Sequence, residues 1–80
     1  MTVDNTVSYG DWVRELRVTG LQQTQEELGE AIGVHSVTVA RWERGITLPF
    51  PFIQKELRKM AEQIQFSEPP VVSRRIGPKG

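Results

Sequence analysis

The sequence predicts an all-α fold, a compact bundle of about four helices that contains a helix-turn-helix, with a flexible N-terminal arm and C-terminal tail. Apolar residues recur at the i, i+4 and i+7 spacing of amphipathic helices in several segments. Capping residues and glycines border these segments, as they typically border helices. Two segments are short and are separated by a glycine-containing turn of about three residues, which is the arrangement of a helix-turn-helix.

The first predicted helix spans residues 9–18. Ser8 precedes it and Asp11 follows three residues later, which is the spacing of a capping box. Gly20 is the predicted stop, because helices commonly end at a glycine in the left-handed conformation. The apolar residues of this segment form a single stripe, made of Tyr9, Val13 and Leu16, with Trp12 beside them.

The second predicted helix spans residues 25–32 and has the clearest start signal in the chain. Thr24 can cap the first amides, and Glu27 can accept a bond from the amide of Thr24. Gly33 ends the helix after little more than two turns, so it is too short to be stable alone. It must therefore pack through its inward-facing residues, which are Leu28, Ala31 and Ile32.

The third predicted helix spans residues 36–44 and ends at Gly45. Val39 and Trp42 share one side of it, so we expect both in the core, and we favour this over a role for Trp42 in base stacking. The opposite side mixes small apolar residues with cations, an unusual combination for a face that only meets water. This outer face consists of Val37, Ala40, Arg41 and Arg44.

The fourth predicted helix spans residues 51–65, with Pro51 at its first position. The segment "SEPPVVSRRIGPKG" follows, with adjacent prolines and no helical period, so we expect it to be disordered. The predicted organisation is a flexible arm (1–7), a helix-turn-helix domain (8–66) and a basic tail (67–80). The apolar stripe of the fourth helix contains Ile53, Leu57, Met60, Ala61 and Ile64.

Composition narrows the functional classes. The chain has 80 residues, enough for one small domain, and its ten basic and ten acidic residues cancel. It has no cysteine and a single histidine, His35, so we expect no metal site and no cofactor. No segment has the length of a membrane span or the pattern of a signal peptide, which predicts a cytoplasmic protein with no membrane partner. We also expect no enzymatic activity, because no nucleophile, base and pocket come together in the sequence.

The segment "TQEELGEAIGVHSVTVARWERG" resembles the helix-turn-helix of the lambda-repressor-like family, which includes Cro, phage repressors and XRE-type regulators. The resemblance covers residues 12–49 and weakens after Pro49. It departs from the family where His35 replaces the usual serine cap, so Ser36 is expected to cap instead, and where Gly29 replaces alanine, which would allow a close helix crossing. "GLQQTQ" is two residues longer than the common pattern, which predicts a longer loop.

The resemblance implies that the third helix lies in the DNA major groove and that the second crosses the backbone. Small apolar side chains suit thymine methyl groups, and arginine suits guanine or phosphate; for Arg41 both contacts stay open. The residues expected to contact bases are Ser36, Val37, Ala40 and Arg41. Those expected to contact phosphate are Gln25, Gln23, Thr38, Arg44 and His35. Those expected to be structural are Trp42, Val39, Leu28, Glu43 and Arg17, with Glu43 paired to Arg17 or, as second choice, Arg14.

Two functions remain open. The first is a sequence-specific regulator of transcription that binds double-stranded DNA, a small Cro-like or phage-type repressor that binds a two-fold operator as a homodimer. The second is a protein-interaction module, such as an antitoxin or adaptor, whose fourth helix and tail bind a partner. The short chain leaves no room for a sensing domain, so no small-molecule ligand is expected. Apolar residues available for a dimer or a partner are Ile64, Phe66, Val71 and Val72.

Overall fold

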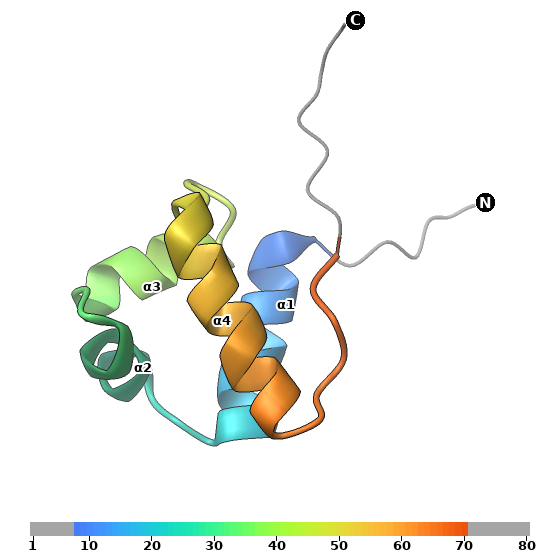
Figure 1. Cartoon of the computed structure of the whole chain (residues 1–80). Coiled ribbons are helices and arrows are strands. Elements are labelled where there is room, and N and C mark those ends of the chain that lie inside the picture. The colour runs from blue at the N-terminus through green and yellow to red at the C-terminus, as the bar shows by residue number, and fades with distance from the viewer. Residues whose placement is uncertain (1–7, 71–80) are drawn as a thin grey trace, which may run out of the picture.

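The computed structural model describes residues 8–70 (Figure 1). The predicted arm, and the part of the predicted tail that holds Val71, Val72 and the basic residues, lie outside the described residues. Within them, the chain is helical and has no strands, which confirms the all-α fold. The elements in order are α1 (Tyr9–Glu15), η1 (Leu16–Leu21), α2 (Gln25–Ile32), α3 (Ser36–Glu43) and α4 (Pro51–Gln63).

The first helix is longer than predicted. Ser8 caps α1 as expected, accepting a bond from the Asp11 amide at 3.1 Å. The helix then continues as the π-helical turn η1 to Leu21, and Gln22 takes the left-handed conformation at φ 55°. The predictions of a stop at Gly20 and of a longer loop were therefore wrong, because the wide π turn takes up the additional residues. Gly20 instead makes room for α4, since a Cβ there would lie 2.8 Å from Cδ1 of Ile64.

The helix-turn-helix follows the predicted bounds closely. α2 has the complete capping box between Thr24 and Glu27, and Gly33 ends it at φ 99°. The cap of α3 differs from the prediction: His35 holds the N-cap position without a side-chain hydrogen bond, and Ser36 is the first helical residue. Imidazole is a poor cap, so this end of α3 depends on packing rather than on capping.

Gly29 is the point where α2 comes closest to the turn. A Cβ at this position would lie 2.5 Å from the backbone oxygen of Val34. The amides of Gly33 and Val34 both donate to the Gly29 carbonyl, at 2.7 and 2.8 Å. A residue without a side chain therefore lets the turn fold back against α2. The close approach at Gly29 is thus to the turn and not the helix crossing that was predicted.

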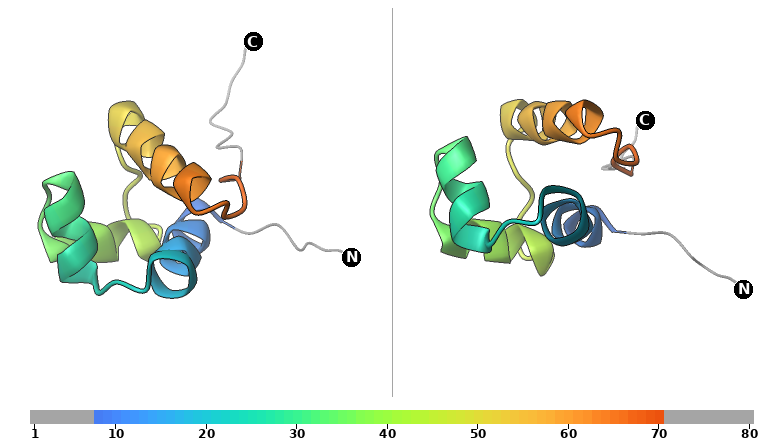
Figure 2. Two further views of the ribbon diagram at one scale, coloured as in Figure 1. Left: turned by 60° about the horizontal axis from the view of Figure 1, so that its bottom comes forward. Right: turned by 90° about the horizontal axis from the view of Figure 1, so that it is seen from below.

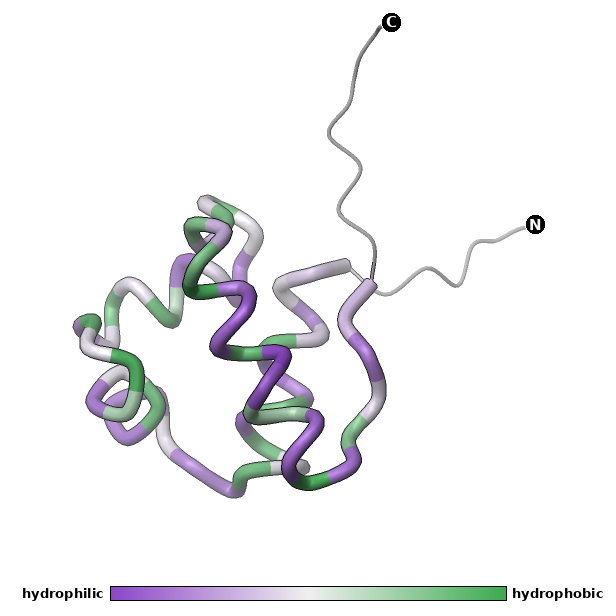
Figure 3. Tube along the Cα trace, viewed as in Figure 1, coloured by the Kyte–Doolittle hydropathy of each residue, from purple (hydrophilic) through white to green (hydrophobic). Residues whose placement is uncertain are grey.

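The core lies between α1 and α3 on one side and α4 on the other. α3 packs against both α1 and α2, and α4 lies across these helices as a separate layer (Figure 2). Apolar residues recur at helical spacing among the hydrophilic residues of α4, so one face of this amphipathic helix is buried (Figure 3). The buried cluster consists of Tyr9, Trp12, Val13, Leu16, Leu28, Val39, Trp42, Ile53, Leu57 and Ala61.

The segment after α4 returns along α1 (Figure 1). The indole N–H of Trp12 donates to the Ser67 carbonyl at 3.1 Å, and Phe66 packs against the core. Pro69 and Pro70 are half-buried. Residues 67–70, which the sequence placed in a disordered tail, thus lie against the domain, because a buried indole needs an acceptor that the helices do not supply.

Candidate nucleic-acid interface

α3 has one buried face and one face open to solvent. Val39 and Trp42 are buried, whereas Val37 is 54% exposed and Arg41 and Arg44 are exposed. Residues at positions i and i+4 are neighbours on a helix. Ser36 therefore lies beside Ala40, and Val37 beside Arg41, so the residues expected to contact bases form one continuous surface. Ser36 and Ala40 are half-buried and form the side of this surface nearer the protein.

An ion pair holds the end of α3 against the first helix. Arg17 of η1 donates from Nε to Oε2 of Glu43 at 2.6 Å and from Nη2 to Oε1 at 3.1 Å. Its Nη1 also donates to the Gln23 carbonyl at 2.9 Å. These hydrogen bonds with Glu43 raise the pKa of Arg17 above its ordinary value. The structure thus brings together the two residues that the sequence paired, and Arg14 is exposed instead.

Two glutamines expected at phosphates belong to the same cluster. The amide Nε2 of Gln25 donates to Oε1 of Glu43 at 3.1 Å, so one of its N–H groups is already used. The side-chain Oε1 of Gln23 is buried and has no partner among the described residues. Both glutamines are half-buried. The Gln25 side chain therefore connects α2 to α3, whereas Gln23 joins the cluster through its backbone carbonyl. A phosphate contact would use the remaining amide N–H of Gln25.

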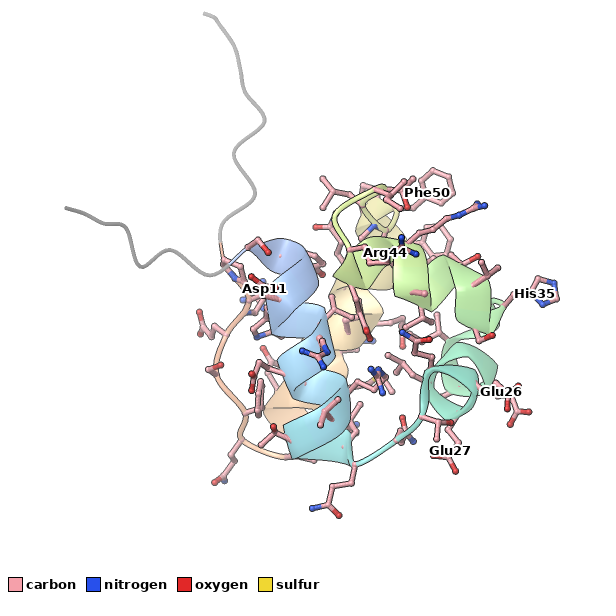
Figure 4. All side chains as sticks on the ribbon, turned by 180° about the vertical axis from the view of Figure 1, so that it is seen from behind. Asp11, Glu26, Glu27, His35, Arg44 and Phe50 are labelled. Carbon is pink, nitrogen blue, oxygen red and sulfur yellow. The ribbon has the colours of Figure 1, made fainter. Side chains whose placement is uncertain are left out.

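The other residues expected at phosphates lie around α3. His35 and Arg44 are exposed and mark its two ends (Figure 4). Thr38 is half-buried and lines a groove beside the α3–α4 loop. The exposed basic side chains of α3 and its two caps are thus Arg41, Arg44 and His35.

The start of α2 carries two acidic residues. Glu26 and Glu27 lie in its first turn and point away from the protein (Figure 4). The carboxylate of Glu27 accepts a bond from the Thr24 amide at 2.9 Å, so it is used in capping. Glu26 has no such role and adds a negative charge where the amides of α2 would attract a phosphate.

Two features of the surroundings of α3, outside its DNA-contacting residues, were missed by the sequence analysis. Gly10 allows α1 to cross the end of α3, because a Cβ there would collide with the backbone oxygens of Trp42 and Glu43. A glycine in the first turn of a predicted helix was the available signal. Phe50 and Phe52 are largely exposed at the start of α4, and two phenylalanines that alternate with Pro49 and Pro51 should have drawn attention.

The described part of the chain contains neither a candidate metal site nor a candidate membrane span. Residues 8–70 contain no group of three or more histidine, cysteine, aspartate or glutamate side chains that could hold a metal. None of the helices in this range is both long enough and apolar enough to pass through a lipid bilayer.

Comparison with known proteins identifies the motif. Residues 13–52, half of the chain, match the Helix-turn-helix family model of the XRE/Cro/C1 type. The match starts within α1 and ends just after the start of α4, so it contains α2, the turn and α3. Searches of curated proteins and of solved structures gave no match. The chain therefore belongs to the XRE/Cro/C1-type helix-turn-helix family and is a DNA-binding helix-turn-helix regulator.

Proposed function

We propose that this protein is a sequence-specific transcriptional repressor of the small Cro-like or phage type, which reads DNA through α3. The supporting observation is the outer face of α3. Val37 and Arg41 project from a helix whose other side is fixed in the core by Val39 and Trp42. An apolar side chain next to an arginine is suited to a thymine methyl group beside a guanine or a phosphate. In this proposal Ser36 and Ala40 complete the base-reading surface.

The proposed backbone contacts surround that surface. Arg44 and His35, at the two ends of α3, would meet phosphates of the two strands that border the groove. Gln25 would donate its second amide N–H to a phosphate while its first stays bonded to Glu43. Gln23 and Thr38 are half-buried and would contribute less. These contacts would set the orientation of α3 and carry no base preference.

We further propose that two copies bind together. An eight-residue helix is only about 12 Å long and reads a few base pairs. A two-fold operator with half-sites about 34 Å apart supplies the additional specificity that a single helix lacks. Such a regulator acts in the cytoplasm, on the nucleoid or, for a phage protein, on DNA in the host cytoplasm.

The test is selection of bound duplexes from random DNA, followed by measurement of stoichiometry on the selected sequence. The proposal predicts a two-fold symmetric consensus that binds two chains. It also predicts that affinity falls steeply with salt, by roughly one unit of logarithmic slope per phosphate contact. A chain that selects no sequence and binds no duplex at low salt would contradict it.

The second candidate, a protein-interaction module, is favoured by the apolar side chains exposed at the start of α4, Phe50 and Phe52. Salt separates the two functions. A complex held by an apolar interface keeps its affinity as salt rises, whereas a complex with DNA does not.

A further inference from the structure

An apolar surface follows directly after α3. It consists of Ile46 and Leu48 in the α3–α4 loop and of Phe50 and Phe52 at the start of α4, and we refer to it as the phenylalanine edge. Phe50 is 69% exposed and Phe52 67% exposed. Their rings stack with centroids 6.1 Å apart and planes within 15° of parallel. Contiguous apolar surface of this kind on a small domain typically marks an interaction site.

Phe50 breaks a local rule of helix structure. It holds the N-cap position of α4 and makes no side-chain cap hydrogen bond. A serine, threonine, asparagine or aspartate there would stabilise the helix by about 1 kcal/mol. Phe50 gives up this contribution without being buried in the core. A residue that weakens its own helix and is exposed to water is best explained by a contact outside the chain.

The same edge contains a recess. A groove of about 400 Å³ lies between α3 and the loop, and Phe50 forms part of its rim. Its lining is mostly apolar and includes Val34, Trp42, Leu48, Pro49 and Ile53. The phenylalanine edge therefore presents a protruding aromatic pair and an apolar hollow side by side. A two-fold interface requires a surface that is complementary to itself, and a protrusion next to a hollow meets this requirement.

The charges favour a second copy over a charged partner. Residues 45–54 contain no charged side chain, and the whole chain has a formal net charge of zero. Two copies that meet at this edge therefore bring together no like charges from residues 45–54. The edge offers no cation to a DNA phosphate and no ion-pair partner to an acidic or basic peptide.

We propose that the phenylalanine edge is the contact between two copies of this chain, and this inference rests on the proposed dimeric binding to DNA. Figure 4 shows Phe50 beside α3, nearer to Arg44 than to His35 in this view. A two-fold contact here joins two α3 helices at the same end and fixes their spacing.

The edge sets the strength of this dimer. Fully burying an aromatic side chain removes about 150–250 Å² from water, so the two exposed rings offer roughly 200–350 Å² per copy. Over both copies the rings offer roughly 400–700 Å². Ile46 and Leu48 add to this, yet the total stays below the ~1,200–2,000 Å² that stable interfaces bury over both partners. The dimer is therefore weak in free solution and is completed on DNA, where two half-sites hold the copies together.

The experiment compares the full chain with the double variant Phe50→Ser/Phe52→Ser. Sedimentation equilibrium measures association in free solution, and titration measures binding to duplexes with one or two of the selected half-sites. The variant should fold, because both side chains are exposed and serine is a good N-cap; circular dichroism and thermal unfolding check this. We expect association, or cooperativity on two half-sites, to fall by about 100-fold or more, while single half-site affinity stays the same.

Val18→Ser is the matched control, since Val18 is also a half-exposed apolar residue but lies on η1. It should leave association and cooperativity unchanged. The proposal is overturned if the wild-type chain binds as independent monomers, if the double variant associates as tightly as wild type, or if Val18→Ser weakens association equally. A dimer that needs the phenylalanine edge but binds no DNA would uphold the contact while refuting the proposed function.

Discussion

Arg17 and Glu43 lie 26 residues apart in the sequence and form a two-bond ion pair in the structure, with side chains 12% and 5% exposed. The pair joins η1 to the last residue of α3. Because Gln25 also donates to Glu43, one carboxylate connects η1, α2 and α3. The orientation of α3 therefore depends on a polar cluster as well as on the core.

Glu43→Gln should destabilise the fold by about 3 kcal/mol, because it leaves the Arg17 guanidinium nearly buried without a counter-charge. Arg17→Met should cost less, since Gln25 still bonds the carboxylate. The double variant should lose less than the two single losses added together. Urea unfolding of all four proteins measures the coupling, which we expect at about 1–3 kcal/mol. Strictly additive losses would show that the pair contributes no interaction of its own.

Tyr9 makes the free energy of unfolding depend on pH in the alkaline range. Burial raises its pKa from 10.0 to about 12. Below pH 10 the phenol is neutral in both the folded and the unfolded chain. Between pH 10 and 12 only the unfolded chain loses the proton, so folding is progressively weakened. The loss approaches roughly 2 kcal/mol near pH 12, since one pKa unit corresponds to about 1.4 kcal/mol.

Tyr9→Phe is the control for this titration. Lysines also lose their charge in this range, so the measured quantity is the difference in unfolding free energy between the two proteins at each pH. Near neutral pH the variant should be as stable as wild type or more so, because the buried Tyr9 hydroxyl has no hydrogen-bond partner among the described residues. Parallel stability curves from pH 8 to 12 would refute the assignment.

Gly29→Ala should destabilise the domain even though alanine is the better helix former by about 1 kcal/mol. The new Cβ would lie 2.5 Å from the Val34 backbone oxygen, and backbone cannot move away cheaply. We expect a net loss of about 1–3 kcal/mol. Gly20→Ala is the matched comparison, because its Cβ meets flexible side-chain ends of Ile64 and Phe66. In thermal unfolding, Gly20→Ala should have a clearly higher midpoint temperature than Gly29→Ala. The reverse order would contradict the predicted collision at Gly29.

Local signals predicted most of the fold, and long-range packing accounts for the differences. The capping box at Thr24 and the glycine at position 33 gave the bounds of α2, because both act within one helical turn. The end of the first helix was mispredicted, since Gly20 serves contacts with Ile64 that lie far along the chain. Likewise, only the folded chain shows that Gly10 faces the carbonyls of Trp42 and Glu43.

The candidate site, too, was predicted in part from local signals and in part is visible only in the folded chain. Helical periodicity separated Val39 and Trp42 from Val37 and Arg41, and the observed burial follows that pattern. Periodicity cannot show which polar side chains bond one another across helices. The bond from Gln25 to Glu43 and the exposure of the phenylalanine edge therefore became visible only in three dimensions.

Trp42→Ala tests the inner face of α3. Trp42 is 3% exposed and lies in the core cluster, so its removal should cost about 3–5 kcal/mol. In an 80-residue domain a loss of this size removes most of the stability, and loss of DNA binding would follow from unfolding. Circular dichroism and DNA titration on the same sample distinguish unfolding from the loss of a DNA contact. A folded Trp42→Ala protein that fails to bind DNA would show that the indole contacts DNA instead.

Arg41→Ala tests the outer face of α3, at the position before Trp42. Arg41 is exposed, so the variant should keep its fold. If Arg41 reads a base, specific affinity should fall by about 1–3 kcal/mol and the preference at one operator position should relax. Arg44→Ala is the matched control: as a phosphate contact it should weaken binding to all duplexes equally and lower the salt slope by about one. Titrating both variants against the selected operator and its single-base variants separates the two roles. Equal losses on every duplex would assign Arg41 to the backbone, and an unchanged affinity would remove it from the interface.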